Sequence, residues 1–282
     1  HSWQQTVELG IHAVSIPEDQ GGIGMGLVAA TAIAEEIGRY ALATPLTSTL
    51  LATFLLRAVD TPEGNALLES MAGGTRVGLA LYGEDASLEG DSTDVRVEDG
   101  KLQGQSWYVT DAQKSELLIV AAESPDGIDL YQVDCQSANI RLLDDRIVDL
   151  TRDQARIQFD GAEAQALTTS GQGLSSLQKA LPALLTLTAA DIAGAAEWQL
   201  QTTAEYAKVR SQFDRPIGFF QAVKHPIVDM MITADETRSL VYQAAAAFDF
   251  EPEDAARCAH LAKSSASDTA EFCSNRSTQL HG

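Results

Sequence analysis

The stretch Arg210-Ser-Gln-Phe-Asp-Arg-Pro-Ile-Gly-Phe-Phe-Gln221 decides how the rest of this sequence is interpreted. Its first residue, Arg210, carries a guanidinium that is always charged and presents a fork of hydrogen-bond donors, which suits a pyrophosphate group. A cation is also favourable at the C-terminal end of a helix, where it opposes the helix dipole. On the residues alone the capping role is favoured, because the dipole effect is generic.

The residues on both sides of this stretch have helical periodicity. Apolar residues recur three or four positions apart on one face from about residue 171, at Leu174, Leu177, Leu181, Leu184, Thr188, Ile192, Ala196, Leu200 and Ala204. Two more long helices are predicted over about 218–248 and 252–280, the second with Pro252 where a helix start tolerates it. Long amphipathic helices with short connections indicate an antiparallel bundle, which we assign to residues 164–282.

The first 75 residues are also rich in alanine and leucine with helical spacing. Leu27, Ala30, Ala34 and Ile37 share one face of a helix that Gly38 is placed to end. Further helices are predicted over 48–59 and from about residue 61, and a glycine-rich connection precedes all of them at 16–24. We therefore expect an N-terminal helical domain over residues 1–75.

The middle of the chain, residues 76–163, has a different pattern. Short β-branched and often alternating segments are separated by Gly, Asp, Asn and Ser turns. The expected strands are 76–81, 95–97, 102–105, 107–110, 117–122, 128–133 and 155–159. Regular short strands with tight turns predict a small antiparallel barrel or sandwich. The fold class is therefore α+β, in the order helical, β, helical.

The composition limits the partners of this protein. Its 282 residues are 45% hydrophobic and 21% charged, which is typical of an ordinary globular protein with a real core. The net charge of −21 argues against nucleic acid and anionic membranes, both of which attract basic surfaces. No apolar run approaches the roughly 20 residues that span a bilayer, and the N-terminus has no signal-peptide pattern. We expect a cytoplasmic protein with no membrane span.

Cys135, Cys258 and Cys273 are odd in number and lack metal-ligand spacing, so we expect reduced thiols and no metal site. The chain begins without a methionine at His1 and stops abruptly at Gly282. Both ends are therefore expected to be truncated.

Five motifs in order resemble those of the acyl-CoA dehydrogenase family, and the resemblance covers nearly the whole chain. They are Leu9–Gly22 with its Ile-Pro-Glu and Gly-Gly elements, Glu35-Glu-Ile-Gly-Arg39, Gly104–Thr110, Arg210–Gln221 followed by Asp229-Met230, and Ala262-Lys263 with Gln279-Leu-His-Gly282. The resemblance implies an FAD-dependent oxidoreductase that introduces a double bond next to the thioester of an acyl-CoA. With the full signature, a cofactor contact for Arg210 becomes the favoured interpretation.

The resemblance also implies residue roles. The residues matching Arg210, Gln212 and Phe213 reach across a dimer interface to the neighbour's FAD, and Gln221 lies close to them. The indole matching Trp107 lies near the isoalloxazine, and the hydroxyl matching Thr110 hydrogen-bonds the ring; such contacts position a cofactor that performs the hydride chemistry itself. Gln279 and Gly282 match the start of a Gly-Gly loop and complete the expected cofactor-binding set.

Two features depart from the family pattern. The catalytic glutamate usually follows the Gly-Gly loop, beyond Gly282, and the alternative position on the first bundle helix matches 183–186, which holds no acid. Asp191 lies about two turns away and is not assigned as the base, so the catalytic residue stays unknown. The stretch 81–91 lacks the family's proline and is crowded with carboxylates, which repel a pyrophosphate or CoA.

This asymmetry favours one subunit of a homo- or hetero-oligomer, the latter as in bacterial enzymes of steroid side-chain catabolism. Such a subunit supplies FAD contacts across an interface in an acyl-CoA dehydrogenase. Two alternatives stay open: a catalytically silent structural subunit, and a relative of the acyl-CoA oxidases or flavin monooxygenases.

Overall fold

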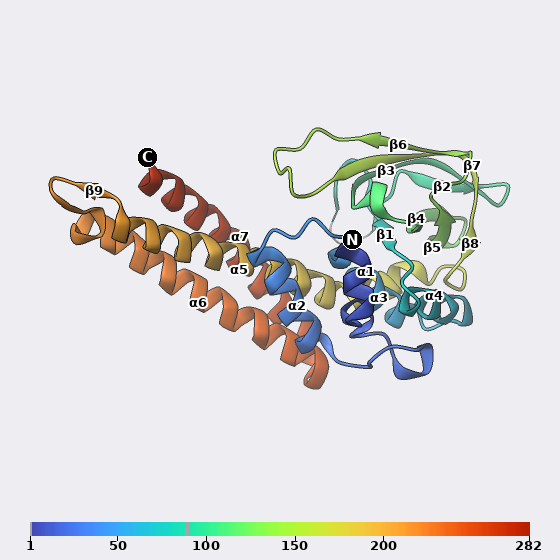
Figure 1. Ribbon diagram of the computed structural model, residues 1–282. Coiled ribbons are helices and arrows are strands. Elements are labelled where there is room, and N and C mark those ends of the chain that lie inside the picture. Colours follow the sequence, from blue (N-terminus) through green and yellow to red (C-terminus); the bar gives the residue numbers. More distant parts are fainter. Residues whose placement is uncertain (1, 88–90) are drawn as a thin grey trace. The chain divides into compact units, whose positions relative to one another are not determined.

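The computed structural model describes residues 2–87 and 91–282 (Figure 1). The chain divides into two compact units that are both discontinuous in sequence. Unit 1 comprises 1–25 and 43–184, and unit 2 comprises 26–42 and 185–282. Each unit is described by itself. The expected boundaries at residues 75 and 163 stay a prediction.

Unit 1 contains the N-terminal helices and the β-sheet. Its helices are α1 (Ser2–Glu8), two 3₁₀ turns η1 (Ile11–Ala13) and η2 (Glu18–Gln20), α3 (Leu46–Val59), α4 (Pro62–Ala72), the 3₁₀ turn η3 (Ala112–Lys114) and the first part of α5 (Gly173–Val209). The start of α4 follows the expected chemistry, because the Thr61 hydroxyl accepts a hydrogen bond from the Gly64 amide and Pro62 occupies the first turn.

The sheet of unit 1 has eight strands. They are β1 (Val77–Ala80), β2 (Val95–Glu98), β3 (Lys101–Thr110), β4 (Leu117–Ser124), β5 (Gly127–Asp134), β6 (Ile140–Asp144), β7 (Gln154–Glu163) and β8 (Gln165–Ala166). Their order is β6-β7-β3-β2-β4-β5-β8, with β1 beside β4. Most pairs are antiparallel as expected, but β1 pairs parallel with β4, and β2 meets β4 in parallel at one position. The sheet is therefore mixed, since the chain returns to β4 through a long crossover that allows parallel pairing.

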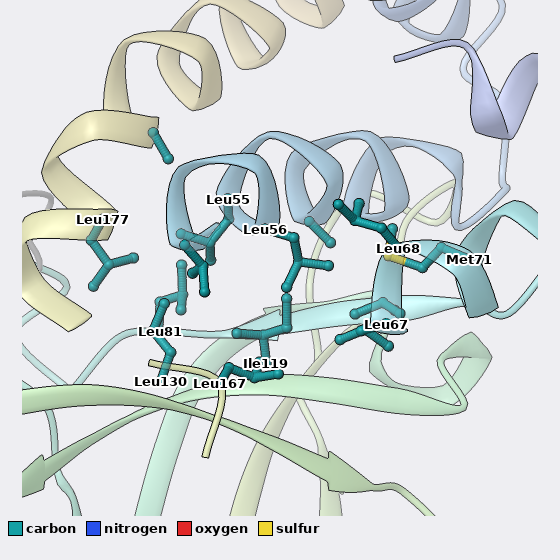
Figure 2. Packing of buried hydrophobic residues seen from close by; sticks show 14 of the residues in the cluster. Leu55, Leu56, Leu67, Leu68, Met71, Leu81, Ile119, Leu130, Leu167 and Leu177 are labelled. Carbon is teal, nitrogen blue, oxygen red and sulfur yellow. The ribbon is translucent and has the colours of Figure 1, made fainter. Parts of the chain in front are cut away.

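Two hydrophobic cores lie on the two faces of β4. Ile119 and Ala121 face a core formed with α3, α4 and the start of α5, and Figure 2 shows Leu55, Leu56, Leu67 and Leu68 in this core. The second core lies among the strands, and β4 contributes Leu118, Val120 and Ala122 to it. Burial on both faces explains why 117–122 is a continuous hydrophobic run without alternation.

Asp129 on β5 holds the start of α5. It is only 2% exposed, and its carboxylate accepts hydrogen bonds from the amides of Gly171, Gln172 and Gly173 at 3.0–3.3 Å. The hydroxyls of Ser124 and Thr168 donate to it as well. A buried carboxylate thus satisfies the free N–H groups at the N-terminus of α5 and opposes the helix dipole.

We expect Asp129→Ala to lower the free energy of unfolding by about 3 kcal/mol, because several buried donors lose their acceptor at once. Asp129→Asn keeps one acceptor oxygen and is expected to cost about half as much. Urea denaturation followed by circular dichroism measures both variants. Equal stability of Asp129→Ala and the wild type would show that the cap is dispensable.

Unit 2 is built from long helices. It contains α2 (Leu27–Arg39), the second part of α5, α6 (Gln221–Phe250) and α7 (Pro252–His281), and α6 and α7 run side by side (Figure 1). The connection from α5 to α6 carries the short strands β9 (Ser211–Gln212) and β10 (Arg215–Pro216) and the 3₁₀ turn η4 (Ile217–Phe219). The helical prediction for the C-terminal region is confirmed, with helix limits that differ from the expected ones by a few residues.

Helix α2 packs into unit 2 through two glycines. A Cβ atom built on Gly38 would lie 1.7 Å from the backbone oxygen of Asp191 on α5, and one built on Gly194 would lie 1.9 Å from that of Glu35. Both distances are far below a van der Waals contact, so only glycine permits this approach of the two helix backbones. Gly38 therefore serves packing rather than ending the helix, which continues to Arg39.

Two carboxylates fix α2 further. Glu35 is 3% exposed and accepts hydrogen bonds from Arg39, Arg238 and the Tyr242 hydroxyl, each at 2.8 Å. At the other end, Asp249 accepts hydrogen bonds from the first two amides of the helix at 2.8 and 3.0 Å. Helix α2 is thereby joined to α6, more than 200 residues later in the chain.

Helix α5 is long and apolar enough, by length and composition, to cross a membrane, and it is the only such helix among the described residues. Its Leu177, Ala180 and Leu184 lie in the first core of unit 1, whereas Ala196 and Leu200 lie in the core of unit 2. Packing inside the protein accounts for this hydrophobicity. The expected absence of a membrane span and the expected location stay predictions.

Candidate functional site

The expected cofactor residues of unit 1 lie at the end of β3, where the strand has a β-bulge. The register with β7 shifts between Ser106 and Val109, so that Trp107 and Tyr108 together oppose Arg156. Tyr108 adopts a left-handed conformation with φ of 57°, which is unusual for a bulky residue. Bulges re-aim side chains next to functional sites, and here the bulge places two aromatic residues together instead of one.

Trp107 and Tyr108 have different surroundings. The Trp107 indole donates a hydrogen bond to Asp94 at 3.0 Å, and the Arg156 guanidinium lies 5.1 Å from the ring centre. Trp107 lines a shallow cleft of about 420 Å³ together with Gln103, Gln105, Gln158 and Asp160, among others. Tyr108 is 39% exposed and donates its hydroxyl to the Glu84 carbonyl at 3.0 Å.

Thr110, the last residue of β3, is exposed, and its hydroxyl has no hydrogen-bond partner within 2–87 and 91–282. Asp111 follows it in a left-handed conformation and is fully buried. Asp111 accepts hydrogen bonds from Ser48 on α3 and from Lys114, which also pairs with Asp153. This network holds the end of β3 against α3 and so fixes the position of Thr110.

The titration of this network follows its burial. Burial raises the pKa of the Asp111 carboxyl, against the hydrogen bonds from Lys114 and Ser48, which lower it. Burial acts to lower the pKa of Lys114, but the hydrogen bonds to Asp153 and Asp111 outweigh it and the pKa is raised. The raised Lys114 pKa contributes stability that is present at neutral pH and is lost only in strongly alkaline solution.

The expected residues of unit 2 gather in an exposed arm between α5 and α6, which we define as residues 210–221. Strands β9 and β10 form a hairpin in it, with Gln212 opposite Arg215. Phe213 at the turn is 85% exposed and has φ of 54°. Gln212 and Gln221, the first residue of α6, are exposed as well. Four of the predicted site residues therefore share one projecting segment.

Arg210 is exposed at the end of α5, where its amide bonds to the Tyr206 carbonyl at 2.9 Å. Its guanidinium forms no ion pair or hydrogen bond with any side chain of the described chain. The other arginine of the arm, Arg215, lies over the Phe219 ring at 4.3 Å. Arg210 is thus a free cation beside an exposed aromatic ring, Phe213.

Gln279 and Gly282 lie at the end of α7 and are exposed. This end is close to the end of α5, because the His281 ring stacks on Tyr206 at 4.3 Å and the Tyr206 hydroxyl donates to the His281 carbonyl. Unit 2 therefore brings the last residues of the chain to the same end as Arg210.

The buried carboxylates of the described chain all have structural partners. They are Glu35, Asp111 and Asp129, and each accepts several hydrogen bonds as described above. The backbone of Asp191 faces α2 at the Gly38 contact. A base that removes a proton next to a carbonyl needs a free carboxylate in a dry pocket, and none of the three buried groups meets that requirement. No cluster of metal-ligating side chains occurs within the described ranges.

The fold and these residues define a class: a helical, β, helical protein with an exposed cationic and aromatic arm. Sequence patterns of the acyl-CoA dehydrogenase N-terminal domain and C-terminal domain match residues 1–74 and 171–282. The chain is 33% identical to acyl-CoA dehydrogenase IpdE2 of Mycobacterium tuberculosis over 275 residues, which are 98% of this chain and 72% of that protein. IpdE2 of Mycolicibacterium smegmatis is 30% identical over 98% of this chain and 73% of its own length.

Solved structures agree with this. One titled "Tcur3481-Tcur3483 steroid ACAD" variant matches with a TM-score of 0.88 and 29% identity, over 99% of this chain and 77% of the other. Butyryl-CoA dehydrogenase from Megasphaera elsdenii has the same fold, with a TM-score of 0.88 at 22% identity over 99% of this chain and 79% of the other. The chain belongs to the acyl-CoA dehydrogenase family. The expected class, an FAD-dependent oxidoreductase acting on acyl-CoA, is thereby confirmed.

The residues present fit an FAD, as their exposure shows. Arg210 offers an unpaired fork of donors for a pyrophosphate, Phe213 offers a ring face, and Thr110 offers a free hydroxyl. Sequence reasoning missed Tyr108 and Asp111, which lie on either side of Val109 and Thr110 and fix the end of β3. Their roles come from hydrogen bonds to distant residues, for which the sequence carries no local signal.

Proposed function

We propose that this chain is one subunit of an oligomeric acyl-CoA dehydrogenase in which each FAD is held by two chains. The arm of residues 210–221 serves the FAD of a neighbouring chain, and the end of β3 with Trp107 and Thr110 supplies the opposite half of a site. The observation that carries this proposal is the Arg210 guanidinium, which is exposed and unpaired within the described residues. A cation with no protein partner beside an exposed phenylalanine is typical of a ligand or interface contact.

Bound FAD would accept the hydride that leaves the carbon one position beyond the acidic one. The protein's own residues bind and orient the cofactor. Arg210 neutralises pyrophosphate charge, the Thr110 hydroxyl positions the ring, and Gln212 and Gln221 supply amide hydrogen bonds, in line with the expectation from the family. Gln279 and Gly282 lie at the same end of unit 2 and extend this set. The substrate class is an acyl-CoA thioester.

We further propose a partner that differs from this chain. The buried carboxylates Glu35, Asp111 and Asp129 are all engaged in structural contacts, and 183–186 contains no acid. The chain therefore has the features of a half-site contributor that relies on a related subunit for the base. The name of the similar steroid enzyme, which joins two designations, agrees with a two-chain assembly and with a steroid acyl-CoA as substrate.

Co-expression of the full-length protein with related subunits tests this. A yellow cofactor and anaerobic bleaching by an acyl-CoA are expected only in a complex with a second, related chain. Full FAD occupancy and turnover by this polypeptide alone would contradict the two-chain assembly. A complex without flavin would identify a silent structural subunit, and fast reoxidation by oxygen would identify an oxidase-type enzyme.

A further inference from the structure

The chain between β1 and β2 is tied to the bulge of β3 from both sides of one peptide unit. Asp94 Oδ2 accepts a hydrogen bond from the Glu84 amide at 2.8 Å. The Tyr108 hydroxyl donates to the Glu84 carbonyl at 3.0 Å. The amide and the carbonyl of Glu84 are therefore both held by side chains from outside its own turn.

The same Asp94 oxygen joins this contact to the aromatic pair of the bulge. It accepts the Trp107 indole N–H at 3.0 Å in addition to the Glu84 amide. The Trp107 amide in turn donates to the Tyr82 carbonyl at 3.0 Å, and the Ser106 hydroxyl donates to that carbonyl at 3.3 Å. One carboxylate oxygen thus connects the start of the loop, the end of the loop and the strand.

The bulge is what makes this arrangement possible. Without an extra residue, successive side chains of β3 would alternate between faces, and Trp107 and Tyr108 would point to opposite sides. Because both oppose Arg156, one ring can reach Asp94 while the other reaches Glu84. Arg156 also pairs with Asp145 at 3.2 Å, so the aromatic pair rests on a charged pair from β6 and β7.

We propose that Asp94 is a positioning residue that holds the Glu84 peptide beside the end of β3 and so sets the edge of the flavin site next to Thr110. The part that concerns flavin rests on the proposed function. Asp94 does not touch the reacting atoms; it acts through Trp107 and Glu84. Its carboxylate matters as a hydrogen-bond acceptor rather than as a charge, because both of its donors are neutral N–H groups.

The variants Asp94→Leu, Asp94→Asn and Trp107→Phe separate these contributions. Asp94→Leu keeps a similar side-chain volume but removes the acceptor, whereas Asp94→Asn keeps an acceptor oxygen. Trp107→Phe removes the indole N–H alone. The control is Gln158→Ala, which lines the same cleft but makes no contact with Glu84.

Hydrogen exchange of the Glu84 amide is measured in the protein without added FAD. We expect Asp94→Leu to accelerate it roughly fivefold, the gain expected when one exposed hydrogen bond is lost. Asp94→Asn should restore slow exchange to within about twofold of the wild type, since a neutral acceptor suffices. Trp107→Phe should fall between the two, and Gln158→Ala should match the wild type. Unchanged exchange in Asp94→Leu, or exchange as fast in Asp94→Asn, would overturn the proposal.

The flavin readout uses the assembled complex. In Asp94→Leu the bound flavin is expected to change the shape of its absorbance spectrum, while the Kd for FAD stays within about twofold, since the pyrophosphate contacts are untouched. An unchanged spectrum would refute the positioning of the flavin edge. If the wild-type complex binds no FAD at all, the proposed function fails, and the exchange experiment still decides the role of Asp94.

Discussion

Arg210→Ala is expected to weaken FAD binding about 100-fold, because a bidentate, charge-assisted contact to a pyrophosphate is worth about 3 kcal/mol. Arg210 has no partner in the described protein, so the substitution removes a ligand contact and breaks no internal bond. The thermal stability of the chain should therefore stay unchanged. Titration of the apo complex with FAD, followed by flavin fluorescence, measures the effect.

Lys208→Ala is the matched control for this variant. Lys208 is exposed two residues before Arg210 and pairs with Glu205 on its own helix. Its loss removes the same net charge from the same end of α5 but no proposed cofactor contact, so FAD affinity is expected to change less than about threefold. Equal losses for the two variants would reduce the role of Arg210 to the general field of the arm. Mixing Arg210→Ala chains with intact partner chains would show which FAD is affected.

Gly194→Ala is expected to destabilise unit 2 by at least about 3 kcal/mol, although alanine is the better helix former by about 1 kcal/mol. The added methyl group would lie 1.9 Å from the Glu35 carbonyl oxygen and 2.8 Å from the Arg39 amide. These are backbone atoms that no rotamer change can move, so α2 must leave its place on α5. Urea denaturation measures the loss, and near-ultraviolet circular dichroism reports the change in packing.

Gln201→Ala serves as the control for Gly194→Ala. Gln201 lies on the same helix, is exposed and contacts only Glu197 of its own turn. Its replacement is expected to change the free energy of unfolding by less than about 0.5 kcal/mol. Stabilisation by Gly194→Ala would mean that helix propensity outweighs the backbone contact and that α2 is loosely packed.

Much of the fold could be predicted from local patterns. The long helices of the C-terminal region follow from their apolar periodicity, and the run 117–122 became β4 because both of its faces are buried. β6 was missed because it lies at the edge of the sheet and has no fully buried residue. The predicted strands 102–105 and 107–110 form one strand, β3, because a bulge lets the chain continue in the same sheet.

The remaining differences arise from contacts between distant parts of the chain. Helix α2 belongs to the compact unit of the C-terminal helices, but its links through Glu35 and Gly38 involve residues far away in sequence. For the candidate site, the sequence identified the arm through a family motif. Asp94 and Asp111 were not predicted as site-forming residues, because an isolated aspartate in a loop gives no indication of which donors it will meet.

The cap that Asp249 places on α2 has a consequence for synthesis. Its carboxylate lies 222 residues after the amide of Leu27 that it accepts. A ribosome adds about 5–20 residues per second, so α2 waits roughly 10–40 s on the nascent chain before its cap exists. During that interval its apolar face has no permanent partner, which makes the 27–39 segment a candidate substrate for chaperones that bind nascent chains.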